Sequence, residues 1–398
     1  MRRVSCGLVC LAASIGVAHA QSSVTLAGDI TTGIAYVSNM GSAFSWNPYA
    51  SNPGQGHAYR FLDNNSTGSR FVLKGTEDLG GGVAAIFNLA DGFKPSNGAF
   101  APGAGGRLFG SQATVGLRSA NVGTVTFGRQ YDPTQDLVAM YASDNDWAGT
   151  IGGHVGDSDN FDGSFRVNNS VKYMSPEWAG LSVGALYGFS NQAGGFSNNS
   201  VWSAAAGYHN GPLGLGVGYM RLNNPDSATN QAGAVGALNG VGSTDDYSNP
   251  FTTNPFGALV AKQQIVSAGG AYTIKNATIG ATFSDVQYNY LDQTSLHLQN
   301  YELNFKYSLT PALVLGAAYL LTDGKFSATP GMENKKPRWN QINLGADYNL
   351  SKRTMVYLVG ALQKANGDAR YAALQPSLFP FSSSSKQFVI TAGIDHRF

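Results

Sequence analysis

The end of the chain alternates between apolar and polar side chains. One face of residues 386–398 carries mostly apolar or aromatic groups: Phe388, Ile390, Ala392, Ile394, His396 and Phe398. The opposite face carries Gln387, Val389, Thr391, Gly393, Asp395 and Arg397. Residues two apart in a strand point to the same side, so this pattern predicts a strand with one apolar and one mostly polar face. Such a strand suits a barrel with lipid outside and water inside.

The same alternation recurs along the chain, for example over residues 301–309 and 341–350. Short connections rich in Gly, Asn, Asp or Pro, which favour tight hairpins, alternate with longer polar segments. The longer segments fall at 38–68, 92–107, 131–166, 190–200, 223–262, 289–298, 324–338 and 365–385. We therefore expect an all-β, transmembrane antiparallel barrel of 16 strands, with short turns on the periplasmic side and long loops outside.

Composition excludes several other classes of protein. Beyond the N-terminus the chain has no apolar run of eighteen residues, which argues against a helical membrane protein. The 25 basic and 24 acidic residues are nearly balanced, so nothing suggests nucleic-acid binding. Charged residues make up 12% of the chain, and its 51 glycines suit many strands joined by tight turns.

The N-terminus has the features of a secretory signal peptide. Arg2 and Arg3 precede an apolar stretch at 4–17, and Ala18-His19-Ala20 forms a cleavage site. We expect residues 1–20 to be removed after export and residues 21–398 to form one barrel domain. Both cysteines of the chain lie in the signal peptide, so we expect no disulfide and no cysteine metal site.

Three segments resemble the general trimeric outer-membrane porins of β-proteobacteria: residues 69–80, 125–133 and 166–176. The resemblance implies a homotrimer in the Gram-negative outer membrane that lets small hydrophilic solutes and ions diffuse passively. It also implies that the third long loop, residues 131–166, folds inward and narrows the pore. Expected partners are outer-membrane lipid, lipopolysaccharide and the barrel assembly machinery, for which Phe398 is the C-terminal signal. No cofactor, metal or catalytic residue is expected.

Three basic residues are candidates for the pore constriction. Arg70 and Lys74 share one parity, opposite to Phe71, so both should face the lumen. Strict alternation would instead turn Arg129 toward lipid, at a cost of roughly 2–4 kcal/mol near the membrane midplane. A bulge at Gly128, or a position at the membrane interface, would relieve that cost, and the family resemblance favours Arg129 on the lumen wall.

The predicted inward loop supplies the opposing acidic groups. From its aspartates we predict that Asp132, Asp136 and Asp144 face the pore, where they would create a transverse field with the basic wall. Asp157 and its neighbours Asp159 and Asp162 are expected to bind backbone amides in turns. The sequence leaves open whether anions or cations are preferred, because the balance depends on which charges pair.

Two other classes of function remain as alternatives. An outer-membrane enzyme would need a nucleophile, a base and an orienting group together, but the histidines are scattered and no Gly-x-Ser-x-Gly motif occurs. A structural barrel closed to solutes would suit about eight strands better than sixteen. The glycine-rich segment 214–218 lies in a predicted strand without a following helix, so it does not indicate a nucleotide site.

Overall fold

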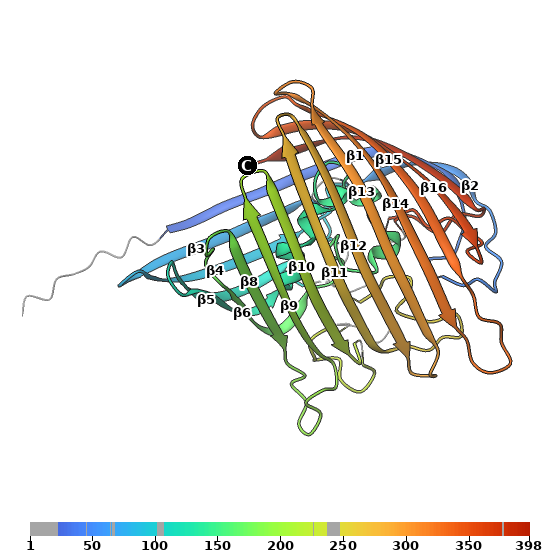
Figure 1. Ribbon diagram of the computed structural model, residues 1–398, viewed down its shortest axis with the longest axis horizontal. Coiled ribbons are helices and arrows are strands. Elements are labelled where there is room, and N and C mark those ends of the chain that lie inside the picture. The colour runs from blue at the N-terminus through green and yellow to red at the C-terminus, as the bar shows by residue number, and fades with distance from the viewer. Residues whose placement is uncertain are drawn as a thin grey trace, which may run out of the picture.

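The structure is a computed structural model that describes residues 23–398 except 45, 64, 66–67, 102–106, 226, 237–246 and 376–377. Its strands form one antiparallel sheet that closes into a tilted barrel (Figure 1). The proposed signal peptide, residues 1–20, lies outside the described residues, so it and the 21–398 domain boundary remain predictions.

The strands follow one another around the barrel in chain order. Their bounds are β1 (Ser23–Met40), β2 (Gly56–Leu62), β3 (Arg70–Gly80), β4 (Val83–Gly92), β5 (Gln112–Ser119), β6 (Gly123–Gln130), β7 (Val167–Met174), β8 (Leu181–Gly188), β9 (Ser200–Asn210), β10 (Leu213–Asn223), β11 (Val260–Ile274), β12 (Ala277–Tyr290), β13 (Ser295–Ser308), β14 (Leu313–Ser327), β15 (Pro337–Asn349), β16 (Thr354–Gly367) and β17 (Lys386–Arg397).

Between β6 and β7 lie one short α-helix and four 3₁₀ turns. They are α1 (Pro133–Leu137), η1 (Ala139–Tyr141), η2 (Ser143–Asn145), η3 (Thr150–Gly152) and η4 (Val155–Asp157). Figure 1 shows these segments in teal within the barrel. No helix in the described part of the chain is long and apolar enough to cross a membrane.

The prediction of sixteen strands is confirmed, with one strand interrupted. Within the described residues, β2 pairs with the second half of β1 and β3 pairs with the first half of β1. The strands β2 and β3 therefore occupy one position of the barrel together. The predicted loop 38–68 therefore contains a strand. Tyr59 and Phe61 point outward from it and are 78% and 55% exposed, an alternation like that of the other strands.

The two faces of the barrel differ as the sequence predicts. On β17, Phe388, Ile390 and Ile394 point outward and are 36–40% exposed, whereas the inward Thr391 and Asp395 are at most 1% exposed. A belt of exposed apolar groups around a closed sheet fits a lipid environment, because closure leaves no unpaired strand edge in the membrane. The outward side chains would be stabilised by lipid and the inward ones by loops and water.

The C-terminal residue closes the barrel. Phe398 exchanges two backbone hydrogen bonds with Gly28, at 3.0 and 3.1 Å. The Phe398 ring lies over this glycine so closely that a Cβ there would be 2.5 Å from the ring Cζ atom. The first strand therefore needs a glycine at this position to let the final aromatic residue pack across the seam.

Enlarging this glycine tests the seam. Gly28→Val is expected to lower the yield of folded barrel several-fold and to lower its melting temperature, because the Phe398 ring and the Arg70 carbonyl oxygen each lie 2.5 Å from the Cβ position and must both move. Gel mobility of unheated and heated protein measures both quantities. Gly360→Val on β16 serves as the matched control, since no atom lies closer than 3.9 Å to a Cβ there. Equal yields of the two variants would contradict a role for the ring in closure.

Candidate functional site

The connection between β6 and β7, residues 131–166, folds into the barrel as predicted. Polar side chains of the wall hold its backbone. The Ser143 N–H donates to Glu302 Oε1 on β13 at 2.7 Å, and Asn343 Nδ2 on β15 donates to the Gly152 carbonyl at 2.9 Å. Each bond satisfies a buried polar group on both the loop and the wall, which fixes the loop inside the barrel.

Asp132 starts the helix of this loop. Its carboxylate accepts hydrogen bonds from the Thr134 N–H at 2.8 Å and from Ser203 Oγ on β9 at 3.1 Å, and the residue is buried. Pro133 follows at the first helical position, as is common after such a cap. Asp132 thus joins helix α1 to the wall, and its side chain is not presented to open lumen.

A buried group of acids surrounds His154 and joins the loop to β13. We call Asp144, Asp157, Asp159 and Glu302 the buried carboxyl cluster, and Asp162 lies half-buried in the same loop. His154 pairs through Nδ1 with Asp159 at 2.6 Å and through Nε2 with Glu302 at 3.3 Å. Burial alone would lower the pKa of His154, but its attraction to Asp159 and Glu302 raises that pKa well above the ordinary value. The histidine is therefore a buried cation that links loop and wall.

The three aspartates that sequence analysis assigned to turns divide between two roles. Asp157 accepts hydrogen bonds from the backbone N–H groups of Asp162 and Ser164, both at 2.8 Å. Asp159 is instead bound by the side chains of His154 and Ser284, and Asp162 accepts a hydrogen bond from Thr150 Oγ1 at 3.4 Å. In the described residues no group of three or more His, Cys, Asp or Glu side chains is arranged to hold a metal ion.

Asp144 belongs to this cluster and is almost fully buried. Burial, followed by repulsion from Glu302, raises the pKa of Asp144 to about 8 from 3.8. The folded protein therefore holds a proton on Asp144 at pH values where the unfolded chain has released it. Its contribution to stability is present at low pH and is lost as the pH rises toward 8.

Asp144→Asn should remove this pH dependence. We expect the variant to gain stability relative to the native protein as the pH rises from 5 to 9, by about 1–3 kcal/mol at the upper end. Thermal unfolding followed by circular dichroism in detergent at several pH values would measure the gain. If the two proteins showed parallel pH profiles, Asp144 would not be protonated in the folded state.

Cross-strand register brings three cations and one acid together on the lumen wall. Asp29 of β1 lies opposite both Arg70 of β3 and Arg397 of β17. Arg70 Nε is 3.1 Å from one Asp29 oxygen, and Arg397 Nε is 3.4 Å from the other. Lys74 lines the same cavity of about 390 Å³, which we call the basic pocket. Arg397 also lies 3.8 Å from Asp395, so the three cationic side chains face two carboxylate side chains and leave an excess of one positive charge.

Neutral polar groups and the start of the inward loop complete the basic pocket. Asn88 donates to Gln112 across β4 and β5, and Tyr131 approaches from the loop. Gln112 lies in the segment 110–113, which contains no basic residue. The positive charge of the pocket therefore comes from β3 and β17.

The bulge expected at Gly128 is present, but it does not bring Arg129 to the basic pocket. The β6–β7 register shifts between Gly128 and Gln130, and Gly128 has a φ of 126°. Arg129 lies opposite Ala113, on the same side of the sheet as Phe127, which is 53% exposed. The Arg129 side chain is nevertheless buried, at 8% exposed, so it does not lie on the open outer face as Phe127 does.

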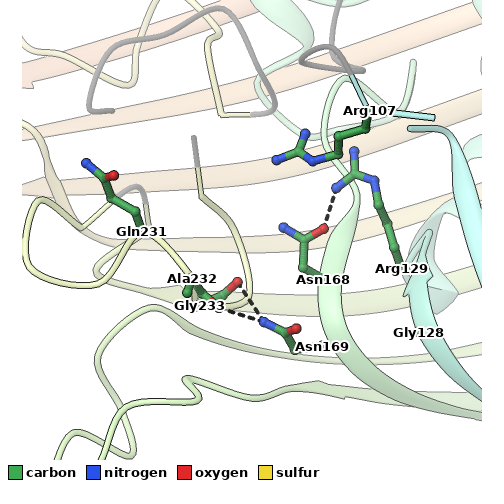
Figure 2. A pocket seen from close by; sticks show the side chains of 8 residues that line it. All are labelled: Arg107, Gly128, Arg129, Asn168, Asn169, Gln231, Ala232 and Gly233. Carbon is green, nitrogen blue, oxygen red and sulfur yellow. Dashed lines mark hydrogen bonds between the residues drawn. The ribbon is translucent and has the colours of Figure 1, made fainter. Parts of the chain in front are cut away.

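Figure 2 shows the surroundings of Arg129. Its Nε donates to the Gly110 carbonyl at 2.7 Å and its Nη1 to Asn168 Oδ1 at 2.5 Å. This second cavity, of about 340 Å³, is lined by Arg107, Gly128, Arg129, Asn168, Asn169, Gln231, Ala232 and Gly233. It shares no residue with the basic pocket. Hydrogen bonds that satisfy the guanidinium explain how a charge is accommodated near the loop end of the barrel.

Of the aspartates predicted to face the pore, Asp136 is the exposed one. It forms an ion pair with Lys172 of β7 at 2.7 Å. Asp146, which sequence analysis did not select, is also exposed and pairs with Lys306 of β13 at 2.6 Å. Each pair joins an exposed aspartate of the loop to a lysine of the wall. Asp132 and Asp144 instead hold the loop in place.

Sequence reasoning missed Asp29, Arg397 and Asp146. Arg397 lay on the polar face of the last strand, so the signal for a lumen position was available. Its closeness to Arg70 was not, because the two residues are far apart in sequence and meet only through the pairing of β17 and β3 with β1. Asp144 lies within the 3₁₀ turn η2 and is buried, whereas Asp146 follows the end of that turn and is exposed. The residue type, which is the same at both positions, does not indicate this difference in exposure.

Comparisons with known proteins agree with this architecture. The family model described as Gram-negative porin matches residues 7–368. An outer membrane porin protein of Bordetella pertussis is 29% identical over 422 residues, and outer membrane porin protein 32 of Delftia acidovorans is 28% identical over 415 residues. Both matches cover 100% of this chain and 100% of the relative.

Among solved structures, an anion-selective porin from Comamonas acidovorans resembles this chain with a TM-score of 0.70 and 23% identity. The match covers 95% of this chain and 100% of the other. At this identity the similarity supports the fold alone.

Proposed function

This chain belongs to the Gram-negative porin family, and from that premise we propose that small solutes cross its barrel between the basic pocket and the inward loop. Family and relatives show an outer-membrane channel for passive diffusion. We further propose which charged side chains determine the selectivity for solutes. Arg70, Lys74 and Asp136 are its sequence-predicted constriction residues, and Arg397 and Asp29 join them.

The observation that carries the proposal is the incomplete neutralisation of the basic pocket. Arg70 and Arg397 both pair with Asp29, Arg397 also pairs with Asp395 at 3.8 Å, and Lys74 adds a third positive charge against these two carboxylates. The exposed loop acids Asp136 and Asp146 are each matched by a lysine. A fixed excess of positive charge along a narrow aqueous path attracts anions and repels cations. A preference for anions follows, like that named for the Comamonas porin.

Liposome swelling tests the proposal. Proteoliposomes should swell faster in gluconate than in a neutral sugar of similar size, and the rate should fall steadily as neutral sugars become larger. Equal rates for gluconate and the sugar would contradict a selective basic pocket. Absence of swelling with every solute would favour the closed structural barrel instead.

The assembly is proposed to be a homotrimer in outer-membrane lipid and lipopolysaccharide. Family membership supports the trimer, because related porins are typically homotrimers. The exposed apolar belt supports contact with lipid and with neighbouring copies. Phe398, which closes the seam, is also proposed as the signal for the barrel assembly machinery. Crosslinking in membranes would show whether the assembly has three subunits.

Family and fold point to a channel rather than an enzyme. We assign no catalytic role to His154 and His297, which both have acidic partners. His154 is buried between Asp159 and Glu302, and His297 pairs with Asp285 at 2.7 Å. The contacts of His154 are those of a structural cation between loop and wall.

A further inference from the structure

Lumen-facing glycines of the barrel wall lie in register with one another beneath the inward loop. Gly216 of β10 pairs directly with Gly207 of β9 and with Gly269 of β11, and we call these three the β9–β11 glycine row. Gly316 of β14 pairs directly with Gly345 of β15, and we call these two the β14–β15 glycine pair. Both sets lie on the inward face of the sheet.

The outward neighbours of these glycines are large. Leu215 and Val217, which flank Gly216, are 46% and 56% exposed on the outer face. The segment 214–218 is therefore a strand with large groups toward lipid and no side chains toward the lumen. Glycine weakens a strand, so its repetition on one face indicates that something approaches the backbone there.

The inward loop occupies the space over the β9–β11 glycine row. A Cβ on Gly216 would collide with the Leu137 carbonyl oxygen, at the end of helix α1. A Cβ on Gly269 would be 3.1 Å from Tyr141 Cδ2 and 3.2 Å from the Val138 carbonyl oxygen. Backbone atoms of the loop thus lie against backbone atoms of the wall, with no wall side chain between them.

Trp147 occupies the space over the β14–β15 glycine pair. Its ring would collide with a Cβ on Gly316 and would be 2.6 Å from a Cβ on Gly345. Trp147 is 4% exposed and packs in a cluster with Ile151 and Val359. A rigid ring in a packed site cannot yield to a larger wall residue without moving the loop that carries it.

The other side of the loop faces the pore. Tyr131, at its beginning, lines the basic pocket together with Arg70. The loop is therefore held between the glycine-lined wall and the aqueous path. Any increase in the distance between the loop and the wall therefore narrows that path.

We propose that the β9–β11 glycine row and the β14–β15 glycine pair set the pore width, because they fix how deeply the inward loop seats against the wall. This makes Gly216 and Gly316 determinants of solute size although neither lines the path. The inference rests on the proposed function, since it concerns the width of the same diffusion path.

Substituting valine for these glycines tests the inference. Folded Gly216→Val and Gly316→Val proteins should each conduct at least about a quarter less than the native protein and should exclude smaller sugars. Gly360→Val, the same change on β16 where no atom lies within 3.9 Å of the Cβ position, should conduct normally. Gel mobility before and after heating identifies the folded protein used in each recording.

A second variant separates displacement of the loop from damage to the barrel. Trp147→Ala combined with Gly316→Val empties the space that the valine needs, so the double variant should conduct more than Gly316→Val alone. Unchanged or increased conductance of folded Gly216→Val and Gly316→Val would overturn the inference. Failure of the native protein to conduct in the same bilayers would instead reject the proposed function.

Discussion

Replacing Arg70 by glutamate is expected to reverse the ion preference of the pore. The change removes one positive charge from the basic pocket and adds a negative one beside Asp29. In water two unit charges 4 Å apart interact by about 1 kcal/mol, so a change of two units should alter the anion-to-cation permeability ratio by roughly ten-fold after salt screening. Reversal potentials under a KCl gradient measure this ratio.

Two arginines outside the basic pocket provide controls for this change. Arg338 pairs with Asp323 on the outward face of β14 and β15, so Arg338→Glu makes the same change in charge away from the path. Arg129→Ala tests the residue that the family resemblance places on the lumen wall. We expect a small effect from either. Arg70→Ala, which removes one positive charge from the basic pocket, is the matching comparison, and an equally large shift with Arg129→Ala would place Arg129 in the constriction.

Removing the Glu302 carboxylate is expected to release the inward loop. Glu302 accepts the Ser143 N–H and pairs with the buried His154, so Glu302→Ala leaves a buried donor and a buried cation without this partner. Breaking one side of a buried ion pair costs about 3–5 kcal/mol. The inward loop should then detach from the barrel wall part of the time, and the channel should show a larger and noisier conductance.

Protease sensitivity gives an independent measure of the same release. Cleavage within residues 131–166 should be faster in Glu302→Ala than in the native protein. Glu302→Gln keeps an oxygen acceptor for Ser143 and should show a smaller change in both assays. Conductance and cleavage both equal to those of the native protein would mean that other contacts suffice to hold the loop.

The fold was predictable because its signals are local. Alternation in residues 386–398 and the glycine-rich short turns needed no knowledge of distant parts of the chain, and they led to the sixteen-stranded barrel. The segment 131–166 was also bounded correctly between β6 and β7. The strand β2 was missed because it is short and lies inside a long polar segment, although Tyr59 and Phe61 alternate within it.

The site was less predictable because it depends on pairings across the sheet. Residue type marked Asp132, Asp136 and Asp144 as equivalent loop acids, yet Asp132 caps a helix and Asp144 is buried beside Glu302. Burial of this kind is decided by how the loop folds against the wall. In the same way, Arg397 meets Asp29 only when β17 closes on β1.

The most direct test of this account is the conductance of the purified protein in a planar bilayer under a KCl gradient. The account predicts stable open steps that close in three equal levels, with a reversal potential of the sign that indicates anion preference. Folded protein that carries no current would contradict the diffusion pore. A current with cation preference would leave the pore in place but contradict the dominance of Arg70, Lys74 and Arg397.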